Sequence, residues 1–148
     1  MTNRAGDWLR QAVRDPEQAE DSRRAGRHEW ACFAAHQAAE KAVKALHLAL
    51  GQEAWGPVIA TLLEELPTAQ RAPGALVEQA RVLDNFYVPS RYPHGHPAGA
   101  PFEHYGPLQS EEGMRYARAI VAFCRPQVAR RGGGAGGGGA LGARRGSR

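Results

Sequence analysis

The sequence predicts an all-α protein, an up-and-down helical bundle of four to five helices with a long ordered loop before the last helix. No segment alternates apolar and polar residues with the period of a β-strand. Residues 28–50 contain neither proline nor glycine and are apolar on most sides, which is typical of a helix at the centre of a bundle. Residues 83–105 instead carry a proline about every four residues, which excludes a regular helix. Because this segment is also rich in aromatic residues, we expect an ordered loop.

The positive charge of the chain is concentrated at its carboxyl end. The formal net charge is +4, yet residues 125–148 hold six arginines and no acidic residue. The rest of the chain is slightly acidic, so a generally basic nucleic-acid-binding face is not expected. The length of 148 residues suits a single core. We place this domain at residues 1–126, followed by a disordered Gly/Arg-rich tail at residues 127–148.

The two cysteines, Cys32 and Cys124, form no CxxC or zinc-type spacing, as expected of reduced thiols in a cytosolic protein. The first residues lack the apolar core of a signal peptide. No apolar run approaches the roughly 18 residues that span a membrane. We therefore expect a cytoplasmic protein without membrane contact, and nothing in the sequence indicates a cofactor.

The first helix is expected within residues 4–24, which begin with apolar residues and then turn polar. Pro16 lies in its interior, where a proline costs about 3 kcal/mol. We expect the helix to be kinked near Asp15 or broken into two pieces. Gly26 marks the turn that follows.

The second helix covers residues 28–50 and ends at Gly51, a residue type that often terminates helices. Four polar residues fall within two turns of it: Gln37, Glu40, Lys41 and Lys44. Their spacing favours either a solvated network of ion pairs or the polar wall of a site that faces the loop. His36 and His47 lie among alanines and leucines, as packing or surface residues do.

Prolines delimit the third and fourth helices. Pro57 enters a short third helix and Pro67 stops it. The fourth helix is expected to begin near Pro73 and to end before Pro89, because the residue before a proline is disfavoured in helical conformation.

The fifth helix follows the loop. Ser110, with two glutamates directly after it, is predicted to be the N-cap of this helix. Apolar residues then recur at helical spacing as far as Cys124, and we expect the helix to end before Pro126.

The loop holds a pair of residues suited to chemistry on a phosphate, Arg91 and His96, which four residues separate. An arginine fork matches phosphate oxygens and stabilises charge in a transition state. A histidine can take a proton from a 2′-hydroxyl or give one to a leaving oxygen. The pair therefore predicts metal-independent RNA cleavage. Four aromatic residues in or beside the loop are candidates for stacking on unpaired bases: Tyr87, Tyr92, Phe102 and Tyr105.

Two stretches together resemble a known family. LDNFYVPSRYPHGHPAGAPFEHY in the loop and WACFAAHQAAEKAVKALHLALGQ in the second helix are similar to the HEPN family, in particular to small stand-alone prokaryotic HEPN proteins. The resemblance covers roughly residues 4–124. It implies a helical bundle that usually forms a homodimer, in which two R-x4-6-H motifs share one cleft. Many HEPN proteins are ribonuclease toxins with a minimal nucleotidyltransferase as antitoxin, and others bind nucleotides or are non-catalytic interaction modules.

The resemblance assigns residues individually. The family's arginine and histidine fall on Arg91 and His96, which are the expected catalytic residues. Glu40 and Lys41 match polar positions of the second helix, and Asp84 matches an acidic residue before the loop, all in supporting roles.

The sequence departs from the pattern at two places. Residues 97–99, Pro-Ala-Gly, stand where some toxins of the superfamily carry a tyrosine that the partner modifies. Gly56 and Pro57 stand where relatives often have a histidine.

Three other interpretations of the loop stay open. Its three histidines could bind zinc as an HxH pair with a third ligand: His94, His96 and His104. Alternatively the loop is purely structural, with Arg91 paired to Asp84 or Glu103. A third possibility is that Arg91 grips the phosphate of a bound nucleotide without turnover.

Overall fold

The structure is a computed structural model that describes residues 3–137, and it confirms the all-α bundle. Five α-helices follow one another, with no strand within these residues. Their bounds are α1 Ala5–Arg24, α2 His28–Ala49, α3 Ile59–Glu64, α4 Gly74–Asp84 and α5 Pro107–Gly137. Three short 3-10 helices lie between them: η1 Thr68–Gln70, η2 Pro93–Gly95 and η3 Pro101–Glu103.

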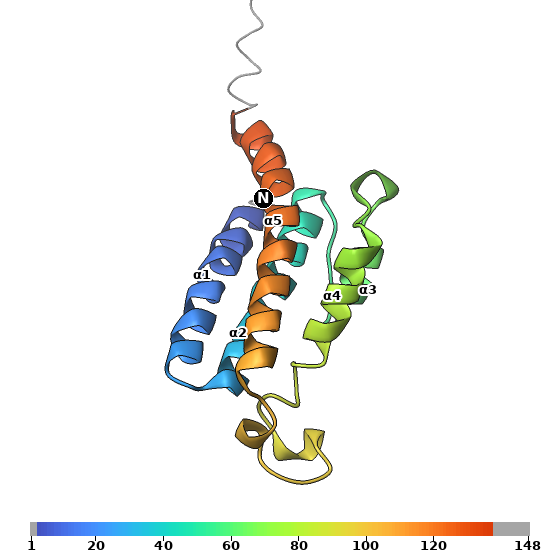
Figure 1. Cartoon of the computed structure of the whole chain (residues 1–148). Helices are drawn as coiled ribbons and strands as arrows, with labels where there is room; N and C mark the ends of the chain where they lie inside the picture. Colours follow the sequence, from blue (N-terminus) through green and yellow to red (C-terminus); the bar gives the residue numbers. More distant parts are fainter. Residues whose placement is uncertain (1–2, 138–148) are drawn as a thin grey trace, which may run out of the picture.

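The central position of α2 is confirmed. It packs extensively against both α1 and α5, while α4 packs against α3 and α5 (Figure 1). The alanines of α2 allow these helices to approach closely, and six of them are fully buried: Ala31, Ala35, Ala38, Ala39, Ala42 and Ala45. The loop before α5 lies at one end of the bundle, opposite the end where the chain begins (Figure 1).

The first helix is continuous across Pro16, so a break into two pieces is wrong. A proline at this position removes the hydrogen bond to the carbonyl of Ala12. Ala12 and Ala19, on either side of the proline, are both fully buried. Their burial in a single helix offsets the lost hydrogen bond.

The two glycine stops are confirmed. Gly26 and Gly51 have φ of 77° and 78°, a left-handed conformation that glycine adopts without strain. After Gly51, the backbone N–H of Gln52 donates to the carbonyl of His47 at 2.8 Å, which closes the end of α2 in a Schellman motif.

The start of α3 is fixed by a residue that is distant in sequence. The backbone N–H groups of Ile59 and Ala60 donate to the carboxylate of Asp84, at 2.6 and 3.1 Å. Asp84 thus caps α3 from the last residue of α4. The helix begins two residues after Pro57 and ends at Glu64, before the expected stop at Pro67.

The fifth helix differs from the prediction at both ends. It begins at Pro107, and Ser110 lies inside it, where its buried hydroxyl contacts His28 Nδ1 at 2.9 Å. The expected end before Pro126 is wrong because the helix continues to Gly137. Val128 is buried in the core, and its burial favours continuation past the proline. The predicted disordered tail therefore overlaps the helix at residues 127–137, and its remainder, residues 138–148, lies outside the described residues.

None of the helices in the described part of the chain combines the length and the apolar character that a membrane span requires. The cysteines Cys32 and Cys124 are both free and buried, as expected.

Candidate functional site

Arg91 lies on a platform of three aromatic rings. Its guanidinium carbon is 4.2 Å from the ring centroid of Phe33, 4.8 Å from that of Tyr87 and 5.2 Å from that of Tyr92. Its Nε donates to the carbonyl of Tyr87 at 2.9 Å. Consecutive turns over residues 85–91 bring the arginine back toward Phe33 of α2. Cation–π contacts of this kind hold a guanidinium in place without neutralising its charge.

The charge of Arg91 has no acidic partner within the part of the chain that the structure describes. The expected pairing with Asp84 or Glu103 is wrong. Asp84 caps α3, and Glu103 instead accepts a hydrogen bond from the backbone N–H of Ala100 at 2.8 Å. The terminal amino groups of Arg91 therefore remain available to an anion.

The platform rests on a buried histidine of α2. The ring of His36 lies 5.0 Å from that of Tyr87 and 6.5 Å from that of Phe33. Its Nε2 donates to the carbonyl of Pro57 at 3.0 Å, and its Nδ1 lies 3.1 Å from Gln37 Oε1. The histidine is fully buried, so the rings above it have a rigid support.

His96 is held on the other side of the loop. Its Nε2 donates to the carbonyl of Pro89 at 2.7 Å. Its ring stacks on that of His104 and meets the ring of Tyr105 edge-on, with centroids 5.9 Å apart. His104 is fixed in turn, because its Nε2 donates to the carbonyl of Ala98 at 2.6 Å. In this arrangement Nδ1 is the nitrogen of His96 that no protein group engages among the described residues.

The loop does not bring Arg91 and His96 into contact. No hydrogen bond or ring contact joins the two side chains within residues 3–137. Arg91 contacts Phe33 of α2, whereas His96 contacts His104 and Tyr105, just before α5.

A glycine sets the path of the loop between these two residues. A Cβ on Gly95 would lie 2.8 Å from the Cα of Pro89, closer than real Cβ atoms come. Only glycine therefore lets the chain approach Pro89 closely enough for the hydrogen bond to His96.

A model of the HEPN domain matches residues 5–127 of the chain. The chain belongs to the HEPN family.

Three solved structures, two of them named as HEPN proteins, are similar to the chain. The chain is 50% identical to TT1696 from Thermus thermophilus, with a TM-score of 0.83 over 85% of this chain and 99% of that one. It is 37% identical to ST0689, an archaeal HEPN homologue, with a TM-score of 0.73 over 86% and 99%. A HEPN domain protein from Thermotoga maritima is 33% identical, with a TM-score of 0.68 over 84% and 98%. A search of curated proteins finds no significant match.

The polar residues expected to support the HEPN site contact other helices or one another. Glu40 accepts from Lys44 at 2.7 Å, and Lys41 donates to Asp15 of α1 at 2.6 Å. Both pairs are largely shielded from solvent. In the described part of the chain these side chains form no ion pair or hydrogen bond with the loop, which agrees with a structural network.

The tyrosines of this HEPN chain differ in what they offer to a ligand. Tyr92 is 48% exposed and stacks on His94, so one of its edges is open to solvent. Tyr87 is half-buried beneath Arg91. Tyr105 packs against Phe86, and burial raises the pKa of Tyr105 to about 12.

The three loop histidines do not assemble as zinc ligands. Two of them use Nε2 to donate to backbone carbonyls, and no group of three potential metal ligands occurs within the described residues. Sequence analysis did not place Phe33, which contacts Arg91, at the site. It described His36 only as a packing or surface residue, and His36 is buried beneath Phe33 and Tyr87. The sequence does hold a signal for both residues. Trp30, Phe33 and His36 follow one another at intervals of three residues on an alanine-rich helix, so they share one face.

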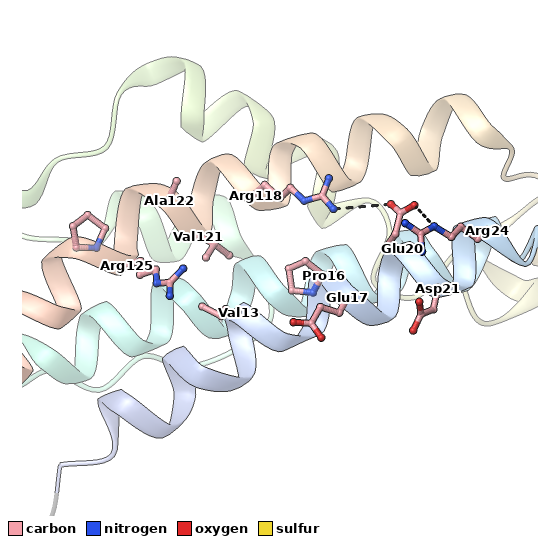
Figure 2. A pocket seen from close by; sticks show the side chains of 11 residues that line it. Val13, Pro16, Glu17, Glu20, Asp21, Arg24, Arg118, Val121, Ala122 and Arg125 are labelled. Atoms are coloured by element: carbon pink, nitrogen blue, oxygen red, sulfur yellow. Dashed lines mark hydrogen bonds and ion pairs between the residues drawn. The ribbon is translucent and has the colours of Figure 1, made fainter.

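A groove of ≈ 830 Å³ lies between α1 and α5 and is lined by none of the predicted site residues. Figure 2 shows its acidic side chains on α1 and its arginines chiefly on α5. Glu20 accepts from Arg24 at 3.0 Å and lies 4.0 Å from Arg118. The charges of this groove therefore largely balance one another, and it offers no excess of either sign to a ligand.

Proposed function

We propose that this HEPN protein binds the phosphate group of an RNA or a nucleotide through Arg91. The observation that carries the proposal is a guanidinium fixed by three aromatic rings and one hydrogen bond, with no acidic partner among the described residues. A planar arginine fork suits phosphate oxygens, and aromatic rings beside it can stack on a base.

The experiment is a calorimetric titration with ATP and, separately, with single-stranded RNA. Arg91→Ala should abolish binding of both ligands. Arg91→Lys should also weaken it strongly, because a lysine keeps the charge but loses the fork and the ring contacts. Arg14→Ala is the matched control, since Arg14 is an exposed arginine of α1. Unchanged affinity in Arg91→Ala would refute the proposal.

A second candidate function is metal-independent cleavage of RNA by Arg91 and His96. The observation that favours it is the fixed orientation of His96, whose Nε2 is bound to Pro89 and whose Nδ1 is left to accept a proton from a 2′-hydroxyl. The family resemblance implies a homodimer with a shared cleft, and we propose that this dimer joins Arg91 of one copy to His96 of the other.

Mixing two inactive variants tests this composite site. Arg91→Ala and His96→Ala should each be inactive alone. When they are unfolded and refolded together, half of the dimers should pair the two variants, and one of the two sites in each mixed dimer is intact. Activity should return to roughly a quarter of the wild-type level in a twofold-symmetric dimer. No recovery in a mixture shown to contain mixed dimers would refute the shared site.

The family resemblance also supports a proposal about the cellular role. We propose that a minimal nucleotidyltransferase acts as antitoxin to this protein and that both are cytoplasmic. Co-expression with a nucleotidyltransferase encoded beside it should relieve any growth arrest that the wild-type chain causes. Arrest that persists despite such co-expression would count against this pairing.

A further inference from the structure

A second groove begins where the Arg91 platform ends. It has a volume of ≈ 470 Å³ and follows the seam between α1 and α2. Phe33 belongs to both features, because its ring supports Arg91 at 4.2 Å and also lines the groove. The next aromatic residue along the groove is Trp30, whose ring meets that of Phe33 edge-on at 6.1 Å. Trp30 is 48% exposed, so much of its ring is open to solvent.

The charges along this groove favour an anion. Lys41 is neutralised by Asp15, which lines the same groove. Arg27, at the other end, has no acidic partner within residues 3–137. An unpaired arginine therefore stands at each side of the aromatic pair, Arg27 beyond Trp30 and Arg91 beyond Phe33.

The length of the groove exceeds that of a single nucleotide. Arg27, the residue directly before α2, and Lys41 are fourteen residues apart, which corresponds to about 21 Å at the rise of an α-helix. Stacked nucleotides rise about 3.4 Å each. Exposed rings can stack only on bases that are unpaired.

We infer that the α1–α2 groove is a subsite for single-stranded RNA, in which Trp30 stacks on a base and Arg27 binds a second phosphate of the strand that Arg91 holds. The inference rests on the proposed function, since it extends the ligand of Arg91 from one phosphate to a strand. Gln18 and Gln37 line the same groove, and their amides can meet base edges.

The test compares a strand with a mononucleotide on the same variants. The probes are fluorescein-labelled single-stranded RNA of about ten nucleotides, within the site sizes of known single-strand binders, and ATP. Trp30→Ala should weaken RNA binding roughly five- to 150-fold, the range for removal of one stacking ring. It should leave ATP binding unchanged. Arg27→Gln should lower the slope of log affinity against log salt by about 0.7 for RNA.

Trp55→Ala is the matched control, because Trp55 is a 79% exposed tryptophan outside this groove. It should bind RNA like the wild type. Wild-type RNA affinity in Trp30→Ala would overturn the groove while leaving phosphate binding at Arg91 intact. A wild-type protein that binds ATP but no RNA would overturn the groove in the same way. A protein that binds neither ligand would overturn both proposals. Sedimentation of Trp30→Ala tests whether Trp30 instead lies at an interface between copies of the chain. An altered oligomeric state with unaltered RNA affinity would assign Trp30 to such an interface.

Discussion

The rings of His96 and His104 lie parallel, with centroids 3.9 Å apart and planes only 2° from parallel. Each ring also donates from Nε2 to a backbone carbonyl, of Pro89 and of Ala98 respectively. Two anchored rings in contact restrict each other's rotation, so His104 positions His96 without needing to contact a ligand itself.

The stack predicts that His104 controls the orientation of the His96 ring. In His104→Ala the ring of His96 should lose its fixed orientation, and in His104→Phe it should keep it, because phenylalanine preserves a flat face. Nitrogen-15 spectra of the imidazoles measure this directly. The wild type and His104→Phe should show a single tautomer of His96 protonated at Nε2. An equally well-ordered His96 in His104→Ala would show that the stack has no positioning role.

Asp84 is predicted to stabilise the fold and not the ligand complex. Asp84→Ala removes the cap of α3 and should lower the free energy of unfolding by about 1–2 kcal/mol. Asp84→Asn keeps one acceptor oxygen and should lose less. Urea denaturation measures both, and ATP binding at temperatures where the variants are folded should be unchanged. A loss of binding without a loss of stability would instead place Asp84 at the ligand.

Gly95 of the loop and Gly74 of α4 form a matched pair that compares a crowded glycine with an uncrowded one. Gly95→Ala should destabilise the protein by about 1–3 kcal/mol, because the new Cβ has no space beside Pro89. Gly74→Ala, at the first residue of α4, meets no atom within 4 Å and should stabilise by about 0.4–1 kcal/mol. Thermal denaturation of both variants decides this. Similar shifts at the two positions would contradict the close packing of the loop.

The stability of the protein should fall in alkaline solution. Burial raises the pKa of the Cys32 thiol to about 12, with the charge of Glu29 adding to the effect, and burial alone does the same at Cys124. The thiols of the unfolded chain lose their protons near pH 9, whereas those of the folded protein keep them. The contribution of the two thiols to the free energy of unfolding is therefore fully present below pH 9 and is lost as the pH rises toward 12. Tyr105 acts in the same direction above its ordinary value of 10.

Urea midpoints across this range measure the effect. A variant with Cys32→Ala and Cys124→Ala should show a smaller decline with pH than the wild type. An identical decline in that variant would assign the alkaline sensitivity to other groups.

Local signals predicted much of the fold. Gly51 stops α2 because only its own conformation matters there, and Pro73 directly precedes α4 for the same kind of reason. Where the prediction failed, tertiary packing decides the structure. The cap of α3 comes from Asp84, and the extension of α5 past Pro126 is favoured by the burial of Val128.

The candidate site followed the same division. Arg91 and His96 stand out in the sequence because of their chemistry and their place in a proline-rich loop. The sequence does not reveal that Arg91 lies on Phe33, since that contact joins residues of different elements. Nor does it reveal the engagement of His96 with Pro89, because the hydrogen bond depends on the path through Gly95.

The position of His36 has a consequence for the thermodynamics of binding. Its buried ring ties the platform under Arg91 to the core and to the carbonyl of Pro57. The proposed anion site is therefore assembled when the bundle folds, before any ligand binds. Such preorganisation spares the complex most of the entropy cost of ordering side chains. A substitution of His36 is therefore expected to change both the stability of the fold and the affinity for the proposed ligand.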